Sequence, residues 1–370
     1  MKVLQRAKEL EAAGRKIVHM EVGEPDFTTA TPIIEAARQA LSSGHTHYSN
    51  AAGIEPLREA ISGFYQQRYG ITVNRSRIFV TPGASGGLNL LANLLINPGD
   101  GILLADPAYP CNRNYIRLMG GEPQLIPVAH ESAFQPTVDL LDQFSTASTA
   151  GLWLASPANP SGTIIERQRL QSLQDWAAGK DLHTVMDEIY HGLHYVEDMP
   201  SLLELSADGF VVNSFSKYFG MTGWRIGWIV VPEQFIEPVN TLAQNLFIAA
   251  STIAQHAALA AFDPATEEIF ESRRQAFRDR RDFLTQALRD IGFSIPHVTE
   301  GAFYLYAGID KFSDDSEEFC QRMLEQHGVA ITPGTDFGDN QAHGYVRFAF
   351  TTDMDDLRLG VDRLHTALVS

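Results

Sequence analysis

The stretch that decides the fold runs from Ser214 to Gly227 and reads Ser-Phe-Ser-Lys-Tyr-Phe-Gly-Met-Thr-Gly-Trp-Arg-Ile-Gly. Its lysine, Lys217, directly follows an apolar run, and a lone lysine in such a place is usually a solvated surface charge. Here it is flanked by the hydroxyls of Ser214 and Ser216 and, eight residues later, by Arg225. Burial beside a second cation makes a lysine amine a nucleophile toward an aldehyde, and two hydroxyls with an arginine suit a phosphate. The stretch therefore predicts a reactive lysine beside an anion site.

Short apolar runs that read as strands lie on both sides of this stretch, and helical patterns separate them. The expected strands are residues 77–81, 101–105, 151–155, 183–187, 210–213 and 225–230. A glycine-rich turn after the first strand leads into a helix expected from about Gly87 to Asn97. Near-continuous apolar strands alternating with helices are typical of a mainly parallel sheet covered on both faces. Ligands bind such sheets at the carboxyl ends of the strands, so we expect the chemistry in the loops that follow them.

The pattern changes near Phe262. Asp263 and Pro264 predict the start of a helix, with aspartate as its N-cap and proline in its first turn, and a long charged helix follows to about Asp290. Strands over 302–307 and 345–350 and a closing helix from about Met354 complete a smaller α+β unit. We therefore expect an α/β fold with two domains, a large one of residues 28–260 and a smaller one of residues 1–27 and 261–370.

Composition excludes several classes of partner. The formal net charge of −17 argues against nucleic acid and anionic membranes, whose phosphates repel an acidic surface. The N-terminus has no apolar core of a signal peptide, and no run approaches the ~20 apolar residues of a membrane span. Two cysteines, Cys111 and Cys320, are too few for a disulfide framework and favour the cytoplasm. The histidine pairs 45/47 and 191/194 lack a third convergent ligand, so no metal is expected.

An acid and a glycine-rich loop follow two other strands. Asp187 ends a strand and Tyr190 comes three residues later. A buried carboxylate needs a cationic partner; a protonated pyridine nitrogen would serve, and a plain helix N-cap is the alternative. In the loop of residues 81–87, the backbone groups of Gly83, Ala84 and Ser85 suit an anion at a helix N-terminus. The alternative is an ordinary tight turn, and the loop matches neither the dinucleotide fingerprint nor the P-loop.

Three further residues stand where a ligand would be held. Asn159 lies in the turn Ser156–Thr163, which alone is a common turn sequence. Tyr109 could stack on a flat ring or pack in the core. Arg347 lies among apolar residues, where an arginine is rarely left unpaired, and a carboxylate in a bidentate fork is its natural ligand.

Together these motifs resemble the class I/II aminotransferases, pyridoxal-phosphate enzymes of fold type I in the aspartate aminotransferase superfamily. The similarity runs from Val22–Phe27 to the final helix, and its most specific part is residues 214–227. It implies transfer of an amino group from an L-amino acid to a 2-oxo acid, in a ping-pong reaction through pyridoxamine phosphate. It also implies a role in amino acid metabolism.

The resemblance also implies the roles of individual residues. Lys217 would hold pyridoxal 5'-phosphate as a Schiff base and move the α-proton, and Asp187 would pair with the pyridine nitrogen. Asn159 and Tyr190 would bind the phenolic oxygen, and Tyr109 would stack on the ring. Arg347 would hold the substrate's α-carboxylate beside Asn159 and the loop of Gly23. The phosphate would be held by Gly83, Ala84, Ser85, Ser214, Ser216 and Arg225.

Tyr48 resembles the tyrosine that reaches the phosphate bound by the partner subunit, which implies a homodimer with active sites at its interface. Relatives usually carry a further N-terminal arm that covers the active site; here the sequence begins at the helix that the arm would precede, which leaves open whether the arm is absent or the start is cut. Some aspartate-preferring relatives have a lysine where this chain has Ser85, which argues against strict aspartate specificity. Aromatic residues such as Phe27, Phe247 and Tyr304 could line an apolar pocket or simply pack.

Two other function classes remain open from the sequence. The same fold and cofactor residues serve C–S β-lyases and other pyridoxal-phosphate lyases or synthases. A non-catalytic regulator that binds the cofactor would carry an added DNA-binding domain, which we do not expect in this acidic chain. The sequence does not identify the amino donor.

Overall fold

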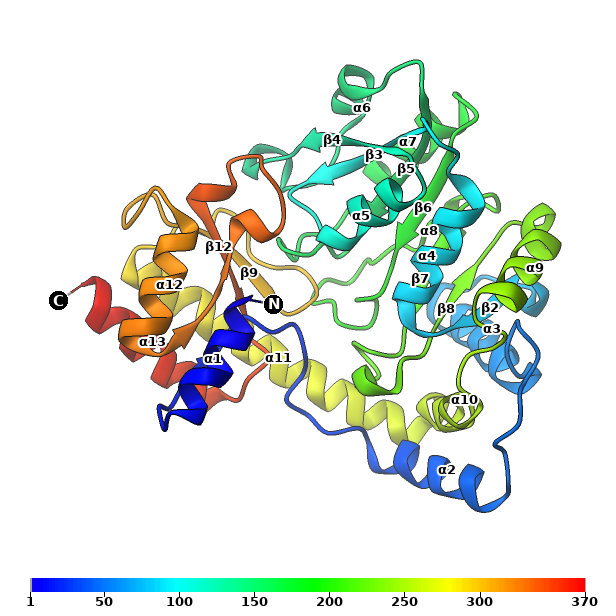
Figure 1. Ribbon diagram of the computed structural model, residues 1–370, viewed down its shortest axis with the longest axis horizontal. Coiled ribbons are helices and arrows are strands. Elements are labelled where there is room, and N and C mark those ends of the chain that lie inside the picture. Colours follow the sequence, from blue (N-terminus) through cyan, green and yellow to red (C-terminus); the bar gives the residue numbers. More distant parts are fainter. Residues whose placement is uncertain (1, 370) are drawn as a thin grey trace.

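A seven-stranded sheet forms the centre of the chain in the computed structural model, which describes residues 2–369 (Figure 1). The strands lie in the order β2-β8-β7-β6-β5-β3-β4. β8 runs antiparallel to both of its neighbours, whereas the other neighbouring pairs are parallel, which confirms the expected mainly parallel sheet. The strands are β2 (Ile78–Thr81), β3 (Gly101–Asp106), β4 (Glu122–Pro127), β5 (Thr149–Ala155), β6 (His183–Asp187), β7 (Phe210–Ser214) and β8 (Gly227–Val230).

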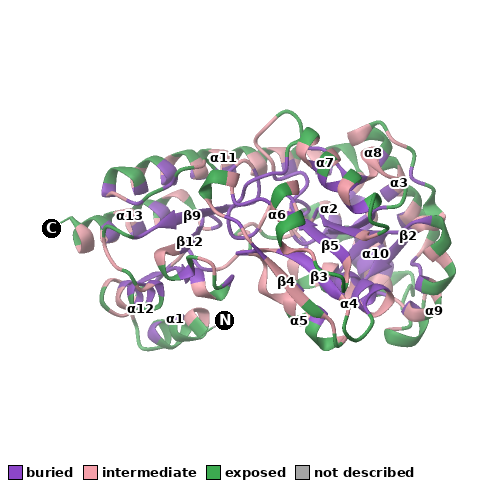
Figure 2. Cartoon of the chain, turned by 90° about the horizontal axis from the view of Figure 1, so that it is seen from above, coloured by how far each residue is buried: buried purple, intermediate pink, exposed green. Residues whose placement is uncertain are grey.

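Successive residues of a strand point to opposite faces of the sheet, and in this sheet both sets of residues are buried. Phe79, Val185 and Ile229 belong to one apolar cluster, and their chain neighbours Val80 and Met186 belong to another. Figure 2 shows the buried strands enclosed by helices whose outer sides are exposed. The helices of this part are α2 (Thr31–Ser42), α3 (Glu55–Tyr69), α4 (Gly83–Leu95), α5 (Pro110–Leu118), α6 (Val138–Phe144), α7 (Arg167–Ala178), α8 (Leu202–Leu205), α9 (Ile236–Leu246) and α10 (Thr252–Leu259).

The remaining elements form two small sheets with their own helices. One sheet is antiparallel, with the order β11 (Thr332–Pro333), β12 (Tyr345–Ala349) and β9 (Tyr304–Gly308). In the other, β1 (Val18–His19) pairs in parallel with β10 (Val329–Ala330), which ties the N-terminal segment to the C-terminal part. Figure 1 shows this group beside the large sheet, with α11 running along both. Its helices are α1 (Lys2–Ala12), α11 (Pro264–Ile291), α12 (Ser316–His327) and α13 (Met354–Leu368).

Several helix and strand boundaries differ from those expected from the sequence. The helix expected from Gly87 begins at Gly83, so the glycine-rich segment forms the first turn of the helix rather than a turn before it. The strand expected from Arg225 begins at Gly227, because Arg225 has a φ of 51° and turns the chain. The side chain of Asp263 makes no capping hydrogen bond to the long helix. The sequence did not predict the edge strand β4, because it contains two prolines and little of it is fully buried.

Strands β5, β6 and β7 are parallel neighbours, so their carboxyl ends lie at one edge of the sheet. The segments that leave this edge carry Asn159, Asp187 and Lys217. The topology thus brings together three side chains that are widely separated in the sequence. Among the described residues, no helix is long and apolar enough to cross a membrane.

Candidate active site

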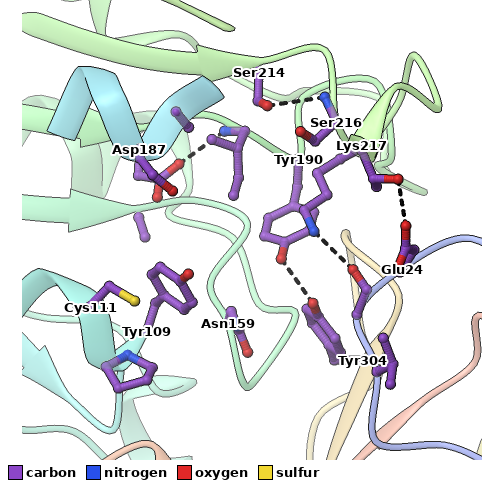
Figure 3. A pocket seen from close by; sticks show the side chains of 18 of the residues that line it. Glu24, Tyr109, Cys111, Asn159, Asp187, Tyr190, Ser214, Ser216, Lys217 and Tyr304 are labelled. Carbon is purple, nitrogen blue, oxygen red and sulfur yellow. Dashed lines mark hydrogen bonds between the residues drawn. The ribbon is translucent and has the colours of Figure 1, made fainter. Parts of the chain in front are cut away.

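A cavity of about 600 Å³ opens at this edge of the sheet (Figure 3). Its floor comes from the loops after β5, β6 and β7 and from the start of α4. Its opposite wall comes from the smaller sheets and from the segment that contains Gly23. A ligand in this cavity would therefore touch both parts of the fold.

Lys217 places its amine inside the cavity. The turn that carries it is held by a hydrogen bond from the Ser216 amide to Ser214 Oγ. Lys217 Nζ donates to the carbonyl of Gly23 at 2.8 Å and lies 5.8 Å from the centre of the Tyr190 ring. No carboxylate of residues 2–369 lies within salt-bridge distance of it. The amine is thus fixed by a neutral acceptor and can exchange that contact for a ligand.

Asp187 is buried at the end of β6 and faces the same cavity. One oxygen accepts a hydrogen bond from the amide of Ile189 at 3.1 Å. Burial raises the pKa of Asp187 to about 6, although that backbone hydrogen bond and the charge of Lys217 act in the opposite direction. Within the described part of the chain it has no ion-pair partner. A cationic ligand atom at this position would relieve the cost of burying the carboxylate.

Backbone amides, hydroxyls and a guanidinium converge beside α4. Gly83 has a φ of 72°, and a Cβ added there would lie 2.5 Å from a guanidinium nitrogen of Arg225. Arg225 donates to the carbonyl of Thr222 at 2.8 Å and lies 3.5 Å from Ser216 Oγ. The amides in the first turn of α4 have no partners within the helix. Donors in this arrangement suit an anion, which the helix dipole also favours.

Arg347 forms the other anion-binding group of the cavity. Its guanidinium lies between the rings of Tyr304 and Phe337, 4.2 Å and 4.8 Å from their centres. It donates to Asn159 Oδ1 at 2.9 Å and to the backbone carbonyl of Glu21, and its Nε has no hydrogen-bond partner. The arginine is 6% exposed and pairs with no carboxylate of residues 2–369. A ligand carboxylate would complete its hydrogen bonds.

Twelve residues expected at a site line this one cavity, and two do not. The lining includes Gly23, Ala84, Ser85, Tyr109, Asn159, Asp187, Tyr190, Ser214, Ser216, Lys217, Arg225 and Arg347. Gly83 lies behind the wall, against Arg225. Tyr48 is 82% exposed and lies outside the cavity. The Tyr190 hydroxyl hydrogen-bonds that of Tyr304 at 3.0 Å, which fixes the Tyr190 ring (Figure 3).

Other lining residues were not singled out from the sequence. Val3 and Leu4 of α1 and Glu21, Thr332 and Phe337 all face the cavity. Only tertiary packing brings them there, and their residue types carry no local signal. Of the aromatic residues considered for a pocket, Tyr304 lines the cavity, whereas Phe27 packs edge-on against Phe277.

A second buried polar cluster lies behind Asp187. Glu188 is fully buried and accepts hydrogen bonds from Ser201 Oγ and from the amide of Leu202. His191 Nδ1 lies 3.5 Å from the Glu188 carboxylate and 2.6 Å from the Tyr69 hydroxyl, and Nε2 contacts the Ser156 carbonyl. Its ring is therefore engaged on both sides. No group of three or more metal-ligating side chains is found in the described residues.

Glu188 is expected to make stability fall with rising pH. Burial raises its pKa from 4.5 to about 8, so the folded chain holds this proton more tightly than the unfolded chain. The stabilisation is complete below about pH 4.5 and is lost as the pH rises through about 8. Relative to the native protein, Glu188→Gln should gain up to about 5 kcal/mol between these limits in urea unfolding. A difference that does not change with pH would contradict this assignment.

Comparison with known proteins gives a consistent result. The family model described as aminotransferase class I and II matches residues 15–364. The chain is 36% identical to the valine–pyruvate aminotransferase of Mycobacterium tuberculosis, over 100% of this chain and 96% of the relative. It is 34% identical to the (5-formylfuran-3-yl)methyl phosphate transaminase of Methanocaldococcus jannaschii, over 98% and 95%. The crystal structure of an aminotransferase from M. tuberculosis superposes with a TM-score of 0.97 at 36% identity, over 100% of this chain and 96% of that one.

Proposed function

Since this chain belongs to the class I and II aminotransferases, which depend on pyridoxal phosphate, we propose that it binds this cofactor covalently on Lys217 and transfers amino groups by a ping-pong reaction. The observation that carries the proposal is the placement of Lys217 Nζ and Asp187 in one cavity, beside a phosphate-binding cradle. The relatives named above differ in the substrate that their names specify, so those names leave the amino donor of this chain open.

The residues present fit pyridoxal phosphate at three separate points. Gly83 leaves space that a Cβ would fill against Arg225, so backbone and guanidinium donors can approach one phosphate. Asp187 is a buried carboxylate without a cation, which suits a protonated pyridine nitrogen. We assign the phenolic oxygen to Asn159 and Tyr190 and the ring face to Tyr109. The phosphate we assign to Ala84, Ser85, Ser214, Ser216 and Arg225, with the Gly83 backbone.

The side chains of the cavity divide the chemistry among them. When bound, pyridoxal phosphate supplies an aldehyde for the substrate amine and a cationic ring that accepts the electron pair of the broken Cα–H bond. Asp187 keeps the ring nitrogen protonated. Arg347 and Asn159 orient the substrate through its α-carboxylate, while the Gly23 loop covers it. Lys217 would take the α-proton on its amine nitrogen as a general base and give it back as an acid.

We also propose a homodimer and a division into two domains. Three large side chains are exposed on two neighbouring segments: Tyr48 by 82%, Leu246 by 45% and Ile248 by 49%. A hydrogen bond from Thr252 to the carbonyl of His47 joins the two segments. Ile248 has a φ of 64°. Such a backbone conformation is strained for a β-branched residue, and strained positions are common at functional sites. A second copy on this surface would bring Tyr48 to its partner's phosphate. Residues 28–260 would form the large domain, and residues 1–27 and 261–370 the smaller, in a cytoplasmic enzyme.

Arg347→Ala is expected to lower kcat/KM for the amino acid about 10²- to 10⁴-fold, because it removes the only guanidinium assigned to the α-carboxylate and leaves that charge unpaired. Arg347→Lys keeps the charge but loses the bidentate contact, so its kcat/KM for the amino acid should be about 10- to 100-fold lower than that of the native protein. The measurement is the rate at which the bound cofactor changes its absorbance as the amino acid concentration is varied. Equal losses at saturating and low amino acid would contradict a binding role.

The test of the function is a pair of half-reactions. The protein is loaded with pyridoxal phosphate, and amino acids are added singly while the cofactor absorbance is followed. We expect conversion to the pyridoxamine form and its reversal by a 2-oxo acid. Release of ammonia and pyruvate from cysteine-type substrates, without such reversal, would instead identify a lyase.

A further inference from the structure

We propose that this site is selective for amino acids and 2-oxo acids with a single carboxylate and an apolar side chain, and that it discriminates against dicarboxylic substrates. The inference rests on the proposed function, because it concerns the same cavity with its cofactor bound. The cationic side chains of the cavity are just enough for the cofactor and one substrate carboxylate.

Three cationic side chains line the cavity within residues 2–369, namely Lys217, Arg225 and Arg347. Arg225 lies beside Gly83 and Ser216 and belongs to the phosphate cradle. Lys217 is the covalent anchor. Arg347 offers one guanidinium, whose Nη1 and Nη2 already donate to Asn159 Oδ1 and to the Glu21 carbonyl, so it can hold one carboxylate. No lysine or arginine of the lining remains for a second one.

The rest of the substrate side carries apolar, hydroxyl and acidic groups. The rings of Tyr304 and Phe337 pack against Arg347, and Leu4 of α1 belongs to the same lining. Three carboxylates not needed by the cofactor, those of Glu21, Glu24 and Asp336, belong to residues of the same lining. Glu21 is 6% exposed; one of its oxygens binds His19 Nδ1 at 2.8 Å and the other has no partner. The ion pair with His19 balances the charge of Glu21, whereas Glu24 and Asp336 pair with no cation of residues 2–369. A second substrate carboxylate would meet the negative field of these two residues without a counter-charge.

A second copy of the chain would not correct this deficit. The two segments that expose Tyr48 and Ile248, residues 41–54 and residues 240–262 with the end of α9 and all of α10, contain no lysine or arginine. Their basic residues are histidines. Of these, His45 and His256 stack on each other with ring centres 4.2 Å apart, and burial lowers the pKa of His256. The partner loops expected at the site therefore bring aromatic and apolar groups rather than a permanent cation.

Leucine and aspartate provide the sharpest test, because their side chains have the same branched outline and differ in charge. The half-reaction rate constant at low substrate is measured for both, with alanine as a small reference. We expect the better of leucine and alanine to exceed aspartate by at least about 100-fold, since a charge left unpaired is rejected far more strongly than a change of size. The same order should hold for pyruvate over oxaloacetate in the reverse half-reaction.

A charge reversal at the rim gives an independent measure. Asp336→Lys should raise the aspartate-to-leucine ratio by about 10-fold, as one repulsive charge becomes attractive. Asp362→Lys makes the same change of net charge on the exposed side of α13, outside the cavity lining, and should leave the ratio unchanged.

The outcomes separate the two proposals. Aspartate reacting at least as fast as both leucine and alanine, with reversal by oxaloacetate, would overturn the selectivity and leave transamination intact. Failure of every amino acid to convert the cofactor would overturn the proposed function and the selectivity with it. A ratio that responds equally to Asp336→Lys and Asp362→Lys would show that the rim carboxylate has no specific role.

Discussion

Replacement of Lys217 by alanine is expected to lower the rate of amino transfer by at least about 10⁴-fold, because one side chain serves both as the covalent anchor and as the proton-transfer group. Its amine donates to the Gly23 carbonyl and lies near the rings of Tyr190 and Phe303, and no other lysine of residues 2–369 lines the cavity to take its place. The measurement is steady-state turnover with an amino acid and a 2-oxo acid.

Lys217→Arg is the matched control for this change. It keeps a positive charge and a donor for the Gly23 carbonyl, but a guanidinium does not lose its proton in proteins and so cannot act as the nucleophile. Both variants should therefore be equally inactive while remaining folded. Substantial activity in Lys217→Arg would mean that the lysine acts through its charge alone, and activity in both would remove it from the reaction.

Asp187→Asn is expected to have the second largest effect, a loss of about 10²- to 10³-fold in the first half-reaction. The amide can still accept the hydrogen bond from the Ile189 amide, but it cannot stabilise a protonated ring nitrogen. The cofactor would then be a weaker acceptor of electrons from the Cα–H bond. The rate is read from the cofactor absorbance at saturating amino acid, so that any weakening of amino acid binding does not affect the measured rate.

The stability of the same variant should change in the opposite direction. Without cofactor, Asp187 is a buried carboxylate whose pKa is raised to about 6 from 3.8, so its ionised form destabilises the fold. Removing the charge should make the cofactor-free variant more stable at pH 8, by up to about 3 kcal/mol. A variant that is both less stable and less active would point to a packing defect instead.

Much of the site could be predicted because parallel strands place their carboxyl ends at one edge. Asn159, Asp187 and Lys217 each follow an apolar strand, and the register of β5, β6 and β7 brings them together. The fold class follows from the same runs of buried residues. The family resemblance then supplied roles that residue types alone leave open, such as Tyr109 stacking on a ring rather than packing in the core.

The remaining features depend on contacts that no local pattern encodes. Leu4 reaches the cavity only because β1 pairs with β10 and carries α1 with it. Phe337 lies in an irregular segment, and its position over Arg347 comes from tertiary packing. Arg225 resembles a strand residue by its apolar neighbours in the sequence, but its positive φ places it in a turn beside Gly83. Leu4 and Phe337 belong to the lining that would face a substrate, which explains why the sequence left the amino donor open.

The most direct test of the central claim is to reduce the cofactor-loaded protein with borohydride and to identify the modified peptide by mass spectrometry. The account predicts that the cofactor becomes permanently attached to Lys217 and that prior addition of a reactive amino acid prevents the attachment. Attachment to another lysine, or none to Lys217 in a protein that still transfers amino groups, would contradict it.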